Sequence, residues 1–557
     1  MYLTRTGARF CLVGGLVAKL GVGIFFNPVS AQIIPDTTLG TENSHVTEGV
    51  DIERIDGGAV RGANLFHSFQ EFNVLDGQQV YFANPADIEN ILSRVTGGNP
   101  SDILGTLGVL GNANLFLVNS NGIVFGPNAR LDVAGSFVAS TANGLDVPDG
   151  STFSATNPEA PPLLAINLAP GLQWGTSQPQ AEIVNRGNLK AGQDLTLAGG
   201  RLNLSGQLEA GRDLTLLATD TVQIRDSAIA PFIAAAGGEL VVQGNQAVDI
   251  FALNHPDSGL FSGGDMVLRS ANTVGGDAHY WSGGSFRIEQ LDNNLGSLSS
   301  PNDPVIRASG DVSFGSYTGA SLHIFAGGSV TVAGDIRITG ADATNGIQET
   351  VTLSDGTTVV EIDGQNKSTL DIRAGTTAFG TPSVTNTDGF SPSEPNTVGI
   401  GTSANITIGG SITNPGGLVF LTNQYNPNTL PGNITVGSIN TSSSLEDGGS
   451  IFIDSRGDIA LNSVIDSSEF PEEILDTELF LFDSNGNLLT ENDDSPTTSG
   501  AGGSTSGLDS YIEYTFNQDG EYIIGVGQFP SEATNGKSAP ILVRIQVEYQ
   551  RQAPECG

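Results

Sequence analysis

The residue types that could do chemistry are thinly spread over this 557-residue sequence. It contains no Gly-x-Ser-x-Gly elbow, no His-Glu-x-x-His pair and no cysteine pairs suited to zinc. The five histidines stand far apart, at positions 45, 67, 255, 279 and 323. Gly536-Lys537-Ser538 ends like a phosphate-binding loop, but Ser531 stands where that motif needs its first glycine. These patterns predict that the protein is not an enzyme.

Composition points to a folded, turn-rich β-protein. The chain has 74 glycines and 26 prolines, too many for a helical bundle, and only 15% of its residues are charged. The chain has 22 basic and 60 acidic residues, which gives a net charge of −38. Nucleic acid is excluded as a partner because phosphate binding needs clustered lysines and arginines. The acidic excess suits divalent cations, or it serves only to keep an extracellular protein soluble.

The segment Met1–Ala31 is typical of a secretory signal. Arg5 and Arg9 precede an apolar run, and Val29-Ser30-Ala31 ends it as a small-residue cleavage site, so we expect cleavage near Ala31. A retained membrane anchor is the alternative, although the run is short and contains Lys19. Of the two cysteines, only Cys556 remains after cleavage, which excludes an internal disulfide.

The region that follows the expected signal is predicted to form short strands. From Gln32 to about Gly175, apolar runs such as Leu115–Val118 and Ile123–Phe125 alternate with turns, and Asn121-Gly122 is a strong hairpin-type turn signal. The stretch Ala86–Arg94 is the best candidate for a short helix.

A repeat begins near Ala181. Gly192-Gln193-Asp194-Leu195-Thr196-Leu197 recurs as Gly211-Arg212-Asp213-Leu214-Thr215-Leu216, and looser copies of this glycine, polar, apolar, polar, apolar pattern extend to Gly449–Ile453. Each copy predicts one strand of a coil, and stacked coils bury the apolar positions in a continuous core. About 20 coils spaced by about 4.8 Å would give a rod roughly 100 Å long.

Two segments depart from this rhythm. Residues 341–402 form an excursion in which only Thr369–Arg373 resembles a coil strand, and such an excursion either confers surface specificity or is inert. Beyond Asp466, four segments predict a small antiparallel sandwich: 476–482, 511–516, 521–526 and 541–549.

The N-terminal region contains, in this order, the segments Ile34–Gly40, Ile55–Gly58, Asn64–Phe69 and Asn119–Gly126. In these segments and in their order it resembles the filamentous-haemagglutinin secretion domain. Members of that family are two-partner secretion exoproteins, whose unfolded chain passes through an outer-membrane β-barrel transporter and folds outside. The resemblance therefore implies that barrel as a partner, an extracellular or outer-surface location, and contact with a membrane only during export.

The family's Asn-Pro-Asn-Gly-Ile motif falls on Asn119, Asn121, Gly122 and Ile123, with Ser120 in place of proline. The resemblance assigns transporter recognition to these four residues. Without proline the turn loses a fixed φ angle. Closing a turn is the alternative role, and the sequence leaves both open.

The C-terminal region contains the acidic segments Asp476–Leu489, Asp493-Asp494 and Asp509–Tyr514. In these segments it resembles the bacterial pre-peptidase C-terminal domain, a small β-sandwich of which some members bind Ca²⁺. The resemblance implies a calcium site because hard cations prefer several oxygen ligands. The candidate ligands are Asp476, Glu478, Asp483, Asn485, Asp493 and Asp494. A solvated acidic hairpin with its turn at Asn485-Gly486 is the alternative.

The sequence thus predicts an all-β protein: a right-handed parallel β-helix that includes the secretion domain, followed by a small antiparallel β-sandwich. The expected boundaries are 1–31 for the signal, 32–178 for the secretion domain, 179–462 for the repeats and 466–550 for the sandwich. The expected function is that of an adhesin-like, non-enzymatic rod with a cell-surface or glycan ligand. An extracellular, calcium-dependent polysaccharide-degrading β-helix enzyme is the alternative. Trp281, beside His279-Tyr280, could stack on a sugar or simply pack between coils.

Overall fold

The computed structural model describes residues 33–47, 49, 52–146, 152–159, 171–173, 181–302, 304–379, 401–443, 448–468, 477–483, 487–496, 510–512, 514, 520–528 and 541–547. All regular structure in these residues is β-strand. No helix in the described ranges could span a membrane. The expected signal, Cys556 and Gly536–Ser538 lie outside them.

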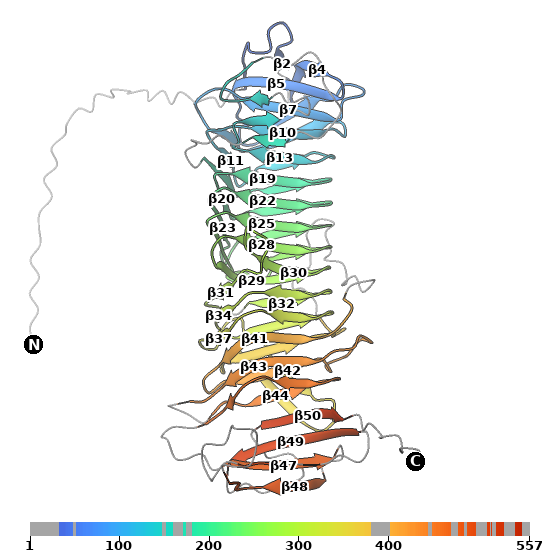
Figure 1. Cartoon of the computed structure of the whole chain (residues 1–557). Helices are drawn as coiled ribbons and strands as arrows, with labels where there is room; N and C mark the ends of the chain where they lie inside the picture. The colour runs from blue at the N-terminus through green and yellow to red at the C-terminus, as the bar shows by residue number, and fades with distance from the viewer. Residues whose placement is uncertain are drawn as a thin grey trace, which may run out of the picture.

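The chain forms a rod of stacked coils whose strands align in three parallel columns (Figure 1). The first column contains β5 (Asn64–Glu71), β7 (Asn90–Val95), β10 (Asn114–Val118), β13 (Phe137–Ser140), β19 (Leu195–Gly199), β22 (Leu214–Ala218), β25 (Leu240–Gly244), β28 (Met266–Ser270), β30 (Phe286–Glu289), β33 (Val312–Phe314), β36 (Val330–Val332), the first halves of β41 (Ile406–Thr413) and β43 (Ile434–Asn440), and β45 (Ile459–Leu461).

The other two columns complete each coil. The second contains β8 (Ser101–Ile103), β11 (Ile123–Phe125), β17 (Glu182–Asn185), β20 (Arg201–Leu204), β23 (Thr221–Arg225), β26 (Ala247–Ala252), the first half of β29 (Val274–Ser282), β31 (Leu298–Ser300), β34 (Tyr317–Gly319), β37 (Ile336–Ile338), the second halves of β41 and β43, and β46 (Ile465–Asp466). The third contains β3 (Glu53–Gly57), β6 (Gln79–Ala83), β9 (Thr106–Leu110), β12 (Arg130–Asp132), β18 (Asn188–Ala191), β21 (Gln207–Ala210), β24 (Ile233–Ala236), β27 (Gly259–Ser262), the end of β29, β32 (Val305–Ala308), β35 (Leu322–Ala326), β40 (Thr369–Arg373), β42 (Leu418–Thr422), β44 (Ile451–Asp454) and β50 (Ile541–Val547).

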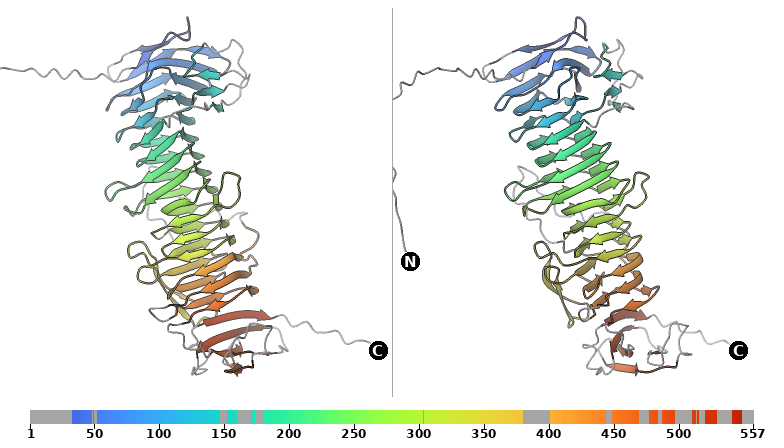
Figure 2. Two further views of the ribbon diagram at one scale, coloured as in Figure 1. Left: turned by 60° about the vertical axis from the view of Figure 1, so that its left-hand side comes forward. Right: turned by 90° about the vertical axis from the view of Figure 1, so that its left-hand side faces the viewer.

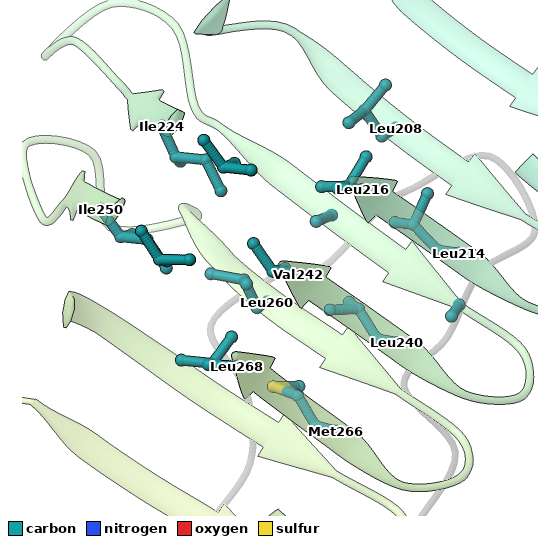
Figure 3. Close-up of a cluster of buried hydrophobic side chains, with 14 of the residues drawn as sticks. Leu208, Leu214, Leu216, Ile224, Leu240, Val242, Ile250, Leu260, Met266 and Leu268 are labelled. Atoms are coloured by element: carbon teal, nitrogen blue, oxygen red, sulfur yellow. The ribbon is translucent and has the colours of Figure 1, made fainter. Parts of the chain in front are cut away.

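The predicted parallel β-helix is confirmed, and the repeat supplies strands of its first column. Leu195 pairs with Leu214, Leu214 with Leu240, and Leu240 with Met266. Figure 3 shows Leu214, Leu240 and Met266 stacked on successive coils. Successive strand residues point to opposite faces, so every second residue of these strands points inward. These inward residues are apolar and form one continuous core cluster along the rod.

The polar residue of the repeat fastens one coil to the next. Asp213, Asp265 and Asp311 each accept, through Oδ1, the backbone N–H of the equivalent residue one coil later, at 2.7–2.8 Å. The glycine before that later residue leaves room for the carboxylate. A Cβ at Gly238 or Gly328 would lie 2.3 or 2.1 Å from the oxygen, so the pattern keeps glycine there.

Antiparallel strands close both ends of the columns. At the N-terminal end, β1 (Ile34–Pro35) and β4 (Ala59–Arg61) pair with β5, and β2 (Ser44–Thr47) pairs with β3. We call residues 33–71 with the strands they contact the N-terminal cap. At the other end, β50 pairs in parallel with β44 and antiparallel with β49 (Gly520–Gln528), followed by β47 (Thr477–Asp483) and β48 (Leu488–Asn492). Closed ends leave fewer free strand edges.

The chain leaves the coils in two excursions, which Figure 2 lets the reader follow from two sides. The first excursion carries the antiparallel sheet of β14 (Gly144–Asp146), β15 (Thr152–Ser154) and β16 (Gly171–Gln173). The second carries the hairpin of β38 (Gln348–Thr352) and β39 (Val359–Asp363). Between β39 and β41 the chain returns to the rod as β40, which confirms the coil strand predicted at Thr369–Arg373.

Three local predictions are wrong. The helix predicted at Ala86–Arg94 is replaced by β7, because β5 and β10 pair with both its edges. The turn at Asn121-Gly122 joins β10 to β11 within one coil and does not form a hairpin. The strand predicted at 511–516 is absent from its described residues, and β48 pairs with β47 instead.

Candidate functional site in the N-terminal cap and first coils

The turn predicted to contact a transporter is built from Asn119. Its side chain is fully buried. Its Oδ1 accepts the N–H of Asn121 at 3.0 Å, and its Nδ2 donates to the carbonyl of Asn99 and to Ser101 Oγ, each at 3.0 Å. Its backbone N–H donates to the carbonyl of Ser140. Asn119 therefore holds together the coil before it, its own turn and the coil after it.

The remaining motif residues divide into buried and exposed ones. Gly122 has φ +122°, and a Cβ there would lie 3.1 Å from the carbonyl oxygen of Glu182. Ile123 lies in the core. Asn121 is exposed, although its Nδ2 donates to the carbonyl of Gly97 at 2.8 Å. In the folded domain only Asn121 and the half-buried Ser120 are open to a partner, while Asn119, Gly122 and Ile123 act through the shape of the turn.

A ladder of asparagines lines the start of the first column. Asn90 Nδ2 donates to Asn64 Oδ1, Asn114 Nδ2 donates to Asn90 Oδ1, both at 2.9 Å, and the N–H of Ser136 donates to Asn114 Oδ1. Such ladders satisfy amide groups from coil to coil. Sequence reasoning missed Asn90 and Asn114, although each precedes an apolar strand run as Asn64 does.

A buried polar network fastens the first residues of the cap. The carboxylate of Asp36 accepts hydrogen bonds from Thr38, Ser68 and Thr96 at 2.6–2.9 Å. Burial raises the pKa of Asp36, but these hydrogen bonds outweigh it and hold the pKa below its usual value. The carboxylate is therefore charged at neutral pH and fixes the segment around β1.

Arg94 joins this network from β7 and was missed by sequence reasoning. Its fully buried guanidinium donates to Ser68 Oγ and Thr38 Oγ1 at 2.9 Å and to the carbonyls of Ser154 and Glu159 at 2.8 and 2.9 Å. It also lies 4.1 Å from the ring centroid of Phe153. Burial lowers the pKa of Arg94 to about 10, against the attraction of Asp36. The sequence signal that could have identified Arg94 is its place as the single basic residue within an apolar strand.

Three of the histidines that could act as bases are enclosed. His67 points into the cap core, with Nδ1 3.0 Å from Ser44 Oγ, and burial lowers its pKa to about 3. His279 is half-buried with its Nε2 enclosed, and its pKa falls to about 4 through burial and the nearby Arg307. His323 is fully buried, with Nδ1 3.2 Å from Asp371 Oδ2.

Trp281 packs on the outer face of the third column. The guanidinium of Arg307 lies 4.7 Å from the centroid of its ring, so that ring already carries a stacking partner. Tyr280 points into the rod, where its hydroxyl donates to the carbonyl of Gly276. The sequence leaves two roles open for Trp281, stacking on a sugar or packing between coils. These contacts agree with packing between coils.

The candidate calcium ligands do not meet at one point. Asp476 and Asn485 lie outside the described residues. Glu478 and Asp483 lie near opposite ends of β47, about 17 Å apart along an extended strand. Both oxygens of Asp483 accept hydrogen bonds from Asn487. Asp493 and Asp494 follow β48, near the Glu478 end because Leu479 pairs with Asn492. The described residues therefore do not bring these candidates together, and within the described ranges no three acidic, histidine or cysteine side chains are grouped to hold a metal. The calcium site stays a prediction.

The N-terminal region also matches a known family. Residues 31–288 match the family model of the TPS secretion domain. This match supports a two-partner secretion domain over these residues. A domain of this kind implies an exoprotein that is secreted or extracellular and an outer-membrane transporter as its partner.

Solved structures of two secretion domains are similar to the chain. The HMW1 secretion domain from Haemophilus influenzae shares 14% identity at a TM-score of 0.31, covering 77% of this chain and 100% of that one. The filamentous hemagglutinin secretion domain shares 18% identity at a TM-score of 0.25, covering 55% and 95%. A search of the curated proteins found no match. The resemblance of the C-terminal region to the pre-peptidase C-terminal domain stays a prediction.

Proposed function

We propose that the protein is an adhesin-like, non-enzymatic exoprotein of a two-partner secretion system. In this proposal a signal cleaved near Ala31 exports the chain to the periplasm, an outer-membrane β-barrel binds the secretion domain, and the rod folds outside the cell. The observation that carries the proposal is the continuity of the three columns. They begin at the N-terminal cap inside the two-partner secretion domain and run on into the repeats without a break.

This continuity links export to folding. Each new coil buries its apolar residues against the coil before it, at about 25 cal/mol for every Å² of apolar surface removed from water. A chain that stacks coils outside the membrane loses that stabilisation if it slides back. The core from Ile33 to Ile453 is one cluster, so the gain continues over the whole rod.

The non-enzymatic part of the proposal draws on the histidines and on the outer faces. His67 and His323 are fully buried and Nε2 of His279 is enclosed, so these three cannot serve a substrate as bases. The outer faces carry ion pairs between neighbouring coils, such as Arg225–Asp249 and Arg212–Asp194. Surface pairs of this kind contribute little to stability, and they leave a polar surface suited to contact with a cell-surface or glycan ligand.

Secretion from a double-membrane bacterium, with and without the candidate barrel, tests the proposal. We expect the protein outside the cell only when the barrel is present. Three variants separate recognition from folding. Asn119→Ala should reduce secretion and also destabilise the purified protein. Asn121→Ala and Ser120→Arg change the exposed and the half-buried residue of the turn, and they should reduce secretion with less loss of stability than Asn119→Ala. Barrel-independent release, or periplasmic retention in every case, would contradict export by a two-partner system.

Binding and degradation assays separate the adhesin from the enzyme. Purified protein should bind cells or immobilised glycans and should release no unsaturated uronides from acidic polysaccharides. Release of uronides would favour the alternative polysaccharide-degrading enzyme. The calcium prediction is tested alongside: EDTA should lower the melting temperature of the C-terminal sheet, and an unchanged melt with EDTA and with added Ca²⁺ would remove calcium from the proposal.

A further inference from the structure

The first excursion and the first residues of the cap share one buried cation. Arg94 points outward from β7, away from the rod core, and is nevertheless fully buried. Two of its hydrogen bonds go to Thr38 and Ser68, in the segment before residue 72. The other two go to carbonyls at Ser154 and Glu159, 60 and 65 residues further along the chain. One guanidinium therefore joins both parts.

The same two parts also share one apolar cluster outside the main core. Phe66, Leu92 and Phe116 point outward from β5, β7 and β10. They are covered from one side by Leu39 and Ala59, and from the other by Leu145, Phe153 and Ala155 of the first excursion. Phe66 and Phe153 meet edge to face, with ring centroids 4.9 Å apart. Without residues 144–155 this outward face of the cap would expose three large apolar side chains.

We propose that residues 152–159 are the closing element of the N-terminal cap, and that Arg94 makes the stability of residues 34–40 depend on their arrival. A chain that has delivered only the segment up to β13 can stack its first coils. Its Arg94 would then lack both carbonyl partners and the ring of Phe153. Folding of the cap is thus delayed until the chain as far as Glu159 is free to fold.

This inference stands on the fold of the described residues, so it holds for a chain refolding in solution whether or not the proposed route of export is correct. In an exported chain, which rests on the proposed function, it would set the length that must emerge before the rod has a stable first end. A failure of secretion and a failure of cap closure are therefore distinguishable, because cap closure is measured on the purified protein.

Amide hydrogen exchange on the full-length protein tests the dependence at equilibrium. In Arg94→Met, which keeps an apolar stem and removes the donors, the amides of Asp36, Thr38 and Ala155 should all exchange at least tenfold faster. These amides donate to Ser68, Asp36 and Asn143 respectively. The amides of β19 and β22 should not change. Faster exchange confined to residues 152–159 would overturn the proposal, because the cap would then close without them.

Two controls keep the test decisive. Arg373→Met removes an equally buried arginine from the rod beneath the second excursion and should leave Asp36 and Ala155 unchanged. If Arg94→Met fails to fold, Phe153→Leu removes only the ring beneath the guanidinium and should still accelerate exchange at Asp36. Pulse labelling during refolding of the wild type gives the order in which the amides of Asp36 and Ala155 become protected. Protection of Asp36 and Ala155 should appear in one phase, and earlier protection of Asp36 would overturn the proposal.

Discussion

The two excursions are fastened to the rod by the same type of residue in different electrostatic settings. Each covers an outward, apolar face of a column, and each buries one arginine completely: Arg94 under the first excursion and Arg373 under the second. Both guanidiniums lie against aromatic rings, Arg94 against Phe153 and Arg373 at 4.3 Å from the centroid of Tyr425. Stacking and multiple planar donors suit arginine to this position.

The hydrogen-bond partners differ. Arg94 donates to hydroxyls and backbone carbonyls, and burial lowers its pKa to about 10. Arg373 donates to both oxygens of Asp371 and to Glu349. Burial lowers the pKa of Arg373, but the two carboxylates outweigh it and raise the pKa above the usual value. The first arginine acts as a hydrogen-bond clamp between neutral groups, and the second completes a buried ion pair.

The largest difference between the two should appear when the ion pair is broken. Arg373→Met leaves the carboxylate of Asp371 buried without its cation, which typically costs about 3–5 kcal/mol. Arg94→Met leaves neutral acceptors and keeps the hydrogen bonds to Asp36, so its cost should be nearer about 1–3 kcal/mol. Hydrogen exchange of β40 measures the cost of Arg373→Met as a local opening free energy, and hydrogen exchange of β5 measures the cost of Arg94→Met. If Arg94→Met costs as much free energy as Arg373→Met, or more, the proposed electrostatic difference between the two arginines is wrong.

Acid should affect the cap through His67. Its folded pKa of about 3 lies below the ordinary value of 6.5, so between these values the unfolded chain binds more protons and stability falls as the pH is lowered. At pH 4.5 the loss relative to pH 7 should reach about 2–3 kcal/mol. Opening of β5, measured at both pH values, should show this loss. In His67→Leu it should be much smaller, and an undiminished loss would assign the effect to other groups.

The tip of the second excursion should give a smaller effect. The backbone N–H and Oγ of Ser354 donate to the two oxygens of the buried Asp454 at 3.0 and 2.6 Å. Ser354→Ala removes one hydrogen bond to a charged group and should loosen the hairpin by about 1–2 kcal/mol. The matched control in the first excursion is Thr152→Ala, whose hydrogen bond to Asp146 is exposed and worth less than about 0.5 kcal/mol. Hydrogen exchange of β39 and β15 compares them, and equal loosening of the two would contradict the prediction.

The fold could be predicted where the repeat carries a shared pattern. Leu195 and Leu214 mark strands of the first column because each follows glycine and a polar residue. The copy at Ile451 also forms a strand, but it lies in the third column, so the pattern predicts a coil strand without predicting its column. The segment Ala86–Arg94 contains residues that favour helix, but pairing on both edges outweighs local preference.

The candidate site could be predicted only in part, for a similar reason. The turn of Asn119 to Gly122 is local, and its glycine and asparagines are visible in the sequence. The partners of Arg94 lie 26 to 65 residues away along the chain, and no local pattern connects them. The acidic residues near the C-terminus look like one cluster in sequence, yet Glu478 and Asp483 are separated by the length of an extended strand.

The carboxylates that join successive coils give the rod a direction. In each pair the acceptor belongs to the earlier coil and the donor to the later one, as for Asp213 with Glu239 and Asp311 with Ser329. A coil that carries one of these aspartates presents its Oδ1 at a fixed position, and Gly238 or Gly328 of the next coil leaves room beside it. The two faces of such a coil therefore differ: the face toward the C-terminal end offers hydrogen-bond acceptors, and the face toward the N-terminal end offers donors.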